Sequence, residues 1–263
     1  MKLKIYQIDA FTDKVFSGNY AAVIIVEEWL SAELMQSIAM ENNLSETAFI
    51  KNTTNNTYEI RWFSPLNEID FCGHATLASA YVLFEQNPTI KEVVFTAAAV
   101  GSLNVSQEKD GYIKMVFPNR KPKEIEAVPE AVLKGLSIAP KEVLLSQQAY
   151  FAIYENEDDI YNVQPNLEEL KKLAPYDLVV TAHSNEYDFI SRYFWPANGG
   201  EEDPVTGSIH TGLAPYWAEK LNKNELKAFQ ASKRGGLLLC NVTDKNVILL
   251  GKAVKYLEGY IEI

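Results

Sequence analysis

The chain has little cysteine and little histidine: Cys72 and Cys240 are its only cysteines, and three histidines occur among 263 residues. Two cysteines exclude a disulfide-rich scaffold, and no zinc-binding spacing of cysteine or histidine is present. No apolar run approaches the roughly 18 residues that a membrane-spanning helix needs. The first residues alternate like a β-strand and lack the apolar core of a signal peptide. We therefore expect a cytoplasmic protein with no metal site and no membrane contact.

Basic residues are also scarce, since 24 Lys and Arg stand against 35 Asp and Glu, for a net charge of −11. A nucleic-acid-binding protein needs a basic surface that releases counterions, so we expect no nucleic-acid partner. An anionic ligand would have to be held by local groups against the field of the whole protein. The other proportions, 47% apolar and 22% charged, are ordinary for a globular protein of one large domain or two smaller ones.

What the sequence does contain is an internal repeat. The segment RWFSP at 61–65 aligns without gaps with RYFWP at 192–196. After a short insertion in the second copy the alignment continues, matching Gly73 with Gly207, Ala80 with Ala214, and 100–105 with 234–239. Both copies therefore run through an aromatic strand, a polar loop, a Gly-led helix, a strand, a Gly turn and another strand. This shared order favours a duplication.

The helices that follow the paired glycines differ from the others. Residues 31–42 and 166–174 have amphipathic patterns, and Asn166 is a suitable N-cap. The stretch HATLASAYVLF at 74–84 has almost no polar face, so it should be buried on all sides. A curved sheet wrapped around one central helix would bury it in this way.

We therefore predict an α+β fold of two duplicated units, residues 1–120 and 121–263, facing each other across a cleft. Each unit is expected to be a mostly antiparallel, barrel-like sheet around its central helix. The last strand, KYLEGYIEI at 255–263, could stay with the second unit or cross to the first.

The two Gly-led helix starts predict an anion-binding site. A helix N-terminus leaves backbone N–H groups unpaired and carries a partial positive charge. Gly73 and Gly207 let a ligand approach these donors, and Ser208 adds a hydroxyl. The alternative is that both glycines only permit tight helix–strand packing. Because the arrangement occurs twice, we favour a site that holds a small carboxylate.

The residue before each glycine limits the chemistry. Cys72 precedes Gly73, and Thr206 holds the matching place before Gly207. A cysteine at a helix N-terminus could have a lowered pKa and act as a base. A two-base racemase needs a second thiol, and the Thr206 hydroxyl cannot replace it near neutral pH. A two-cysteine mechanism is therefore excluded, and Cys72 is better explained as a small packing residue.

Other groups must then move protons. Glu46 lies between a helix and an apolar strand, and Asp203 lies in a Pro-stiffened turn before the second Gly-led helix. Taken singly, Glu46 is a solvated loop carboxylate, Asp203 a turn or capping residue, and His74 a polar helix-start residue. Taken together, they could supply an acid/base carboxylate and a polar partner that tunes it.

Four motifs in order carry a resemblance to a known family: FSGNYAAV (16–23), NLSETAF (43–49), DFCGHATLA (70–78) and EEDPVTGSIH (201–210). Together they resemble the PhzF family of phenazine biosynthesis, which belongs with the diaminopimelate-epimerase-like proteins, over essentially the full length. The resemblance implies a cofactor-independent isomerase and a homodimer. The type reaction of the family moves a proton on the ring of trans-2,3-dihydro-3-hydroxyanthranilate, a small carboxylate.

The resemblance also implies residue roles. Glu46 would be the acid/base, while His74 and Asp203 would orient substrate polar groups and aid the transfer. The substrate-binding residues would be Asn19, Gly73, Gly207 and Ser208. The chain departs from the family at three positions that would reshape the pocket: Tyr20, where a proline is common, and Ala231 and Lys233, where glycines are common. Two alternatives remain open, namely an amino-acid racemase that uses Cys72 and a protein that binds a carboxylate without chemistry.

Overall fold

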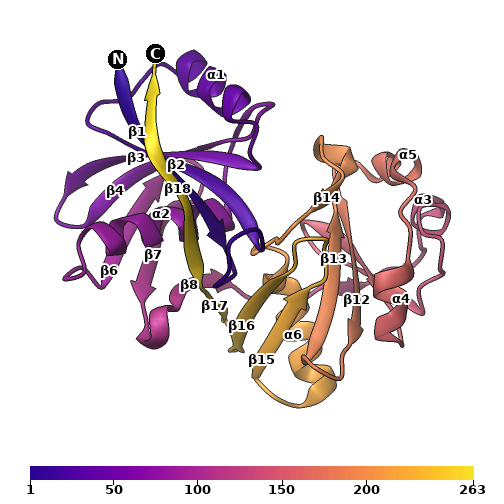
Figure 1. The fold of residues 1–263 in the computed structure, drawn as a ribbon. Coiled ribbons are helices and arrows are strands. Elements are labelled where there is room, and N and C mark those ends of the chain that lie inside the picture. Colours follow the sequence, from indigo (N-terminus) through magenta and orange to yellow (C-terminus); the bar gives the residue numbers. More distant parts are fainter. The chain divides into compact units, whose positions relative to one another are not determined.

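The computed structural model describes all 263 residues and shows the α+β fold that the sequence predicts (Figure 1). The chain forms two compact units, one made of Met1–Val116 with Leu250–Ile263 and the other of Phe117–Leu249. From the sequence we placed the boundary at residue 120. The last strand, β18 (Ala253–Glu262), lies in the first unit, where it pairs antiparallel with β1 (Lys2–Ala10) so that the two termini lie side by side (Figure 1).

The first unit also contains most of the strands of the first repeat. These are β2 (Asn19–Val26), β3 (Glu46–Thr54), β4 (Thr57–Phe63), β5 (Glu68–Ile69), β6 (Glu92–Ala97), β7 (Gly101–Gln107) and β8 (Ile113–Pro118), the last of which runs across the boundary. Its helices are α1 (Ala32–Asn42), α2 (Gly73–Gln86) and the short 3₁₀ turn η1 (Lys109–Gly111).

The second unit contains the corresponding elements of the second repeat. Its strands are β9 (Lys123–Glu124), β10 (Glu142–Leu145), β11 (Ala149–Ile153), β12 (Asp177–His183), β13 (Phe189–Phe194), β14 (Glu202–Asp203), β15 (Glu225–Gln230), β16 (Gly236–Val242) and β17 (Asn246–Gly251), which also runs across the boundary. Its helices are α3 (Glu130–Lys134), α4 (Glu157–Asn162), α5 (Leu167–Leu170), η2 (Lys171–Leu173), η3 (Pro196–Asn198) and α6 (His210–Leu221).

The two units share one strand topology. In the first, β2 pairs parallel with β3, β3 antiparallel with β4, β4 parallel with β6, and β6 antiparallel with β7. In the second, β11, β12, β13, β15 and β16 follow the same sequence of parallel and antiparallel pairings. The long helices α2 and α6 occupy the same place in this order. The duplication predicted from the sequence is therefore confirmed in the fold.

A repeated ion pair fixes the register of the two copies. Arg61 on β4 donates to both carboxylate oxygens of Glu68 on β5, at 2.7 Å each. Arg192 on β13 donates in the same two-pronged way to Glu202 on β14, at 2.8 and 2.9 Å. The arginines align before the insertion and the glutamates after it, so the extra residues of the second copy fall in the turn between the paired strands.

In the first unit the sheet separates α1 from α2. Helix α1 begins after Ser31, whose side chain accepts a hydrogen bond from the Leu34 N–H, and it packs Met35 and Ile38 against β-strand residues that include Phe49. Helix α2 packs against β1, β2, β3 and β7 and is buried almost all round, as its sequence predicts. No helix of the chain is long and apolar enough to cross a membrane.

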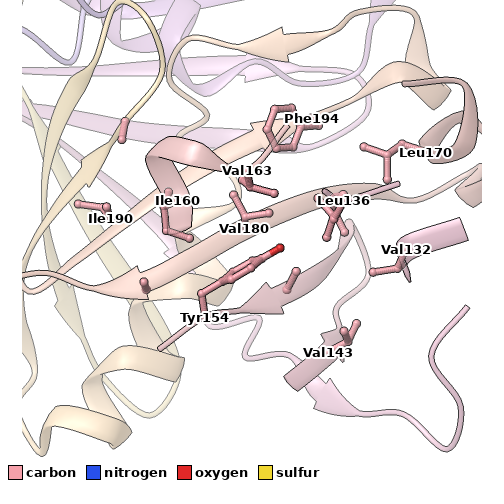
Figure 2. Close-up of a cluster of buried hydrophobic side chains, with 14 of the residues drawn as sticks. Val132, Leu136, Val143, Tyr154, Ile160, Val163, Leu170, Val180, Ile190 and Phe194 are labelled. Carbon is pink, nitrogen blue, oxygen red and sulfur yellow. The ribbon is translucent and has the colours of Figure 1, made fainter. Parts of the chain in front are cut away.

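In the second unit the short helices cover one face of the sheet. Buried apolar side chains form a cluster between these helices and the sheet (Figure 2). In it, Ile160 and Val163 pack against Val180, Ile190 and Phe194 of β12 and β13. Alternate residues of a strand point to opposite faces, so the intervening residues of these strands face α6. The Trp217 indole of α6 accordingly donates to Thr181 Oγ1 at 2.9 Å.

Candidate active site

The alternation of β3 directs Glu46 toward the start of α2. Phe49 packs in the cluster beneath α1, so Glu46, three residues earlier, points to the opposite face of the sheet. His74 is the second residue of α2 and lies at the helix end nearest to this carboxylate. The fold therefore brings together two of the three catalytic residues predicted from the sequence, beside Gly73.

Glu46 and His74 form a buried pair. The carboxylate oxygen Oε2 of Glu46 lies 2.8 Å from the imidazole Nε2 of His74, and the residues are only 8% and 5% exposed. Despite this short contact, Oε2 has no well-aligned hydrogen-bond donor. The carboxylate and the imidazole are therefore in close contact and shielded from water.

Asn19 fixes the orientation of the His74 ring. The Asn19 amide Nδ2 lies 3.1 Å from His74 Nδ1, and its Oδ1 accepts a hydrogen bond from the Ser45 hydroxyl at 3.0 Å. With Oδ1 occupied by Ser45, the amide donates to Nδ1 of the neutral ring, whose own proton is then on Nε2, facing Glu46. In the protonated ring Nδ1 carries a proton as well, and the amide must turn its oxygen toward it. Asn19 is fully buried and contacts His74 directly. Ser45, which orients Asn19, was not identified from the sequence.

The surroundings of His74 favour its protonated form. Burial alone would lower the pKa of the imidazole, because it disfavours the charged ring. The sulfur of Cys72 and the carboxylate of Glu46 act in the opposite direction and outweigh burial, so the pKa of His74 lies well above its usual range. His74 can therefore hold a second proton in its place beside Glu46.

Cys72 does not have the lowered pKa that its place at a helix start suggested. Burial and then the charge of Glu46 raise the pKa of the thiol to about 11, although His74 and the Ala75 N–H act in the other direction. The thiol is buried. Burial thus raises the pKa of Cys72 by more than the helix N-terminus lowers it. Cys72 is therefore better explained as a packing residue than as a base.

Three potential metal-binding atoms meet at this place. One donor atom each from Glu46, Cys72 and His74 lie within 4.8 Å of one another, although the sequence shows no metal-binding spacing. A carboxylate, a thiolate and an imidazole are a donor set suited to an ion such as Zn²⁺. Any metal would have to displace the proton of Cys72 and would occupy the Glu46 carboxylate.

In the second unit, Thr206 contacts Asp203 instead of serving as a second base. The Thr206 hydroxyl donates to Asp203 Oδ2 at 2.5 Å. The turn that carries both residues is held by the buried Gln230, whose Oε1 accepts from the Thr206 N–H and whose Nε2 donates to the Asp203 carbonyl, both at 2.8 Å. This turn orients the Asp203 carboxylate.

Ser208 and Gly207 lie in the tight turn that leads into α6. The N–H groups of His210 and Thr211 donate to the carbonyls of Gly207 and Ser208, so the turn continues directly into the helix. The Ser208 hydroxyl accepts a hydrogen bond from the Gln148 amide at 2.9 Å. The same amide also donates to the Tyr193 hydroxyl, which in turn donates to Asp177.

Sequence reasoning missed Gln148, Tyr193 and Asp177. A signal for one of them was present, because the gap-free alignment that pairs the aromatic strands, extended towards the N-terminus, also places Glu46 on Asp177. Gln148 carries no comparable signal, since the offset changes between the repeats before this strand.

The three departures from the family pattern lie in different surroundings. Tyr20 is half-buried on β2, next to Asn19. Ala231 is buried and its N–H donates to the Ser191 carbonyl at 2.7 Å. Lys233 is exposed.

Comparisons with known proteins agree on one family. The family model of phenazine biosynthesis-like proteins, PhzC-PhzF, matches residues 8–259. The chain is 44% identical over 263 residues, and over all of both chains, to a Pseudomonas aeruginosa protein described as an uncharacterized isomerase. It is 40% identical to the crystal structure of a PhzF-family phenazine biosynthesis protein from Enterococcus faecalis, with a TM-score of 0.94 and full coverage of both chains.

A more distant match extends the fold. A hydroxyproline epimerase from Agrobacterium vitis superposes with a TM-score of 0.63 at 10% identity, over 99% of this chain and 92% of that one. At this identity the likeness concerns the fold alone. It agrees with the epimerase-like architecture predicted from the sequence.

Proposed function

The chain belongs to the PhzC-PhzF family of phenazine biosynthesis-like proteins, and on this premise we propose that it is an isomerase that moves a proton on a small carboxylate substrate. The observation that carries the proposal is the buried Glu46–His74 pair at the N-terminus of α2, with its 2.8 Å contact. The compound to test first is trans-2,3-dihydro-3-hydroxyanthranilate.

In the proposed reaction, Glu46 removes the proton from a substrate carbon and returns it at a neighbouring position. Its carboxylate is buried and lies 2.8 Å from His74 Nε2, so the pair can take up and release a proton. His74 faces Glu46 through Nε2 and holds positive charge easily, so it balances the charge of the Glu46 carboxylate before the first proton transfer and after the second. Asn19 keeps the ring in this orientation.

Asp203, Gly207 and Ser208 of the second unit are the residues that the sequence predicts to bind polar atoms of the substrate. Asp203 accepts hydrogen bonds, and its position is set by Thr206 and Gln230. Ser208 and Gly207 lie just before the N-terminus of α6, where backbone N–H groups and the helix dipole favour an anion. The Ser208 hydroxyl and the backbone at Gly207 suit the carboxylate of the substrate. No metal or organic cofactor takes part in the proposed steps.

The racemase alternative gains no support from the site. It requires Cys72 as a base, and burial together with Glu46 raises the pKa of this thiol to about 11. It also requires a partner base where the chain has Thr206, whose hydroxyl is already directed to Asp203. A protein that only binds a carboxylate remains the alternative that the experiment must separate.

The test is exchange of carbon-bound hydrogen in D₂O, followed by NMR, with EDTA present throughout. Wild-type protein is expected to introduce deuterium into trans-2,3-dihydro-3-hydroxyanthranilate or into one compound of a panel of small carboxylates. Glu46→Gln should reduce the exchange rate by roughly 10²–10⁴-fold, because it removes the acid/base group. Its affinity for the substrate should stay nearly unchanged.

Glu41→Gln is the matched control, since Glu41 is an exposed glutamate of α1. It should exchange at the wild-type rate. Normal exchange by Glu46→Gln would sink the assignment of the acid/base. Saturable binding of a carboxylate without any exchange would instead identify a binding protein.

A further inference from the structure

Asp177 occupies in the second unit the position that Glu46 occupies in the first. In the parallel pair β2–β3, Glu46 lies opposite Ala21, and in the parallel pair β11–β12, Asp177 lies opposite Ala149. Thr47, which follows Glu46, lies opposite Phe63, and Leu178, which follows Asp177, lies opposite Phe194. Phe63 and Phe194 are equivalent in the repeat. By the same repeat, Ser208 occupies the position of His74, since each directly follows one of the matched glycines.

The Asp177 carboxylate makes different contacts from the Glu46 carboxylate. Both oxygens of Asp177 are occupied, because Oδ2 accepts from the Tyr193 hydroxyl at 2.5 Å and Oδ1 accepts from the Asn198 amide at 2.7 Å. Burial raises the pKa of Asp177, although these two hydrogen bonds act against the shift. Burial and the charge of Asp177 raise the pKa of Tyr193 well above its usual value, so the shared proton stays on the phenol.

The direction of every following hydrogen bond is then fixed. Tyr193 gives its only proton to Asp177, so its oxygen can only accept from Gln148, and the Gln148 side chain must present its NH₂ group. The same nitrogen donates to Ser208 Oγ at 2.9 Å. The Ser208 hydroxyl accepts a hydrogen bond from Gln148, and no protein group accepts a hydrogen bond from the Ser208 hydroxyl.

We propose that Gln148 is a positioning residue that forces the Ser208 hydroxyl to act as a hydrogen-bond donor to a carboxylate oxygen of the bound substrate. The inference rests on the proposed function, because it assumes a carboxylate ligand. In this proposal the carboxylate of Asp177, which is equivalent to Glu46 in the repeat, fixes the polarity of a binding group and moves no proton itself. Gln148 itself does not touch the substrate.

The test is a double-mutant cycle on ligand affinity. The probe is 2-aminobenzoate, an aromatic carboxylate that resembles the proposed substrate, and aniline is the matched compound without the carboxylate. Gln148→Met keeps the size of the side chain but donates no hydrogen bond, so it should weaken 2-aminobenzoate binding by about 10- to 100-fold, the loss of one hydrogen bond to a charged group. Tyr193→Phe should weaken it by a smaller factor, because Gln148 loses one of its two anchors.

The discriminating measurement is the same substitution in a Ser208→Ala background. There, Gln148→Met should change the Kd by less than about twofold, because the hydroxyl that it positions is gone. A purely structural role would weaken binding equally in both backgrounds and would overturn the proposal. Gln147→Leu, at the exposed neighbouring position, is the control and should bind as the wild type does.

The outcome is independent of turnover. If no substrate exchanges hydrogen but the cycle shows coupling through Ser208, the proposed reaction fails and the positioning role stands. If exchange occurs and the cycle shows no coupling, the positioning role fails alone. Equal affinity for aniline and 2-aminobenzoate, or no binding of 2-aminobenzoate by the wild type, would also overturn the proposal.

Discussion

His74 Nε2 lies 2.8 Å from Glu46 Oε2, inside the first unit and away from bulk water. An ionised carboxylate and an imidazole at this distance stabilise each other's charged forms, and burial strengthens the interaction. Neither residue has another charged side chain as an ion-pair partner. The protonation state of His74 therefore depends on Glu46.

Glu46→Gln should lower the pKa of His74. The carboxylate helps to hold this pKa well above its usual range, and without it the effect of burial, which lowers the pKa, gains weight. An NMR titration of the His74 ring should show protonation at a distinctly lower pH in the variant. The same titration of Glu41→Gln should match the wild type, and an unchanged His74 pKa in Glu46→Gln would show that Glu46 does not control the ring.

Cys72→Ala should retain proton exchange to within about threefold, since the thiol is a packing residue and the substitution removes only one buried atom. The folded wild type should also resist iodoacetamide at pH 8 at this residue, because the pKa of the buried thiol is raised to about 11 and the thiolate is scarce. Mass spectrometry after unfolding should then find Cys72 unmodified. Loss of exchange in Cys72→Ala would restore the thiol as a base.

The sequence predicted the fold more completely than the site. Alternation and the paired RWFSP and RYFWP segments identified the repeat, because these are local signals that the strand period imposes. That Glu46 and His74 meet depends on how β3 registers beside β2 and how α2 packs on the sheet, and a single sequence contains no such distance. The pKa of Cys72 was misjudged for the same reason, because burial is a property of the folded chain.

Gly18→Ala should destabilise the first unit and disturb the site. Gly18 has a φ of +66°, and a Cβ atom there would lie 2.1 Å from the Ala10 carbonyl oxygen. The backbone would have to move next to Asn19, the residue that orients His74. We expect a loss of more than about 2 kcal/mol in unfolding free energy, from strain in the left-handed region and the clash together.

Gly111→Ala is the control for that strain, because its φ is +79° and nothing lies within 4 Å of an added Cβ. Gly111→Ala should lower the unfolding free energy by about 1 kcal/mol, from the strain of the left-handed backbone conformation alone. Urea unfolding measures both variants. Equal losses would mean that the close approach of Gly18 to Ala10 contributes nothing.

The stability of the protein should depend on pH through His210. This histidine is fully buried, its Nδ1–H donates to the Thr206 carbonyl at 2.9 Å, and its Nε2 has no partner. Burial lowers its pKa from 6.5 to about 4, although the bond to Thr206 acts in the other direction. Between these two values the unfolded chain binds a proton that the folded chain does not.

Unfolding free energy must therefore fall as the pH drops from about 6.5 towards 4, by up to about 3 kcal/mol for a shift of this size. His210→Asn can still donate to the Thr206 carbonyl but does not titrate, so the difference in stability between wild type and variant should shrink across this window. Urea unfolding at half-unit steps from pH 7 to 4 measures both proteins. A constant difference between wild type and His210→Asn would mean that His210 takes up its proton without unfolding. Its unpartnered Nε2 would then have to be solvated in the native state.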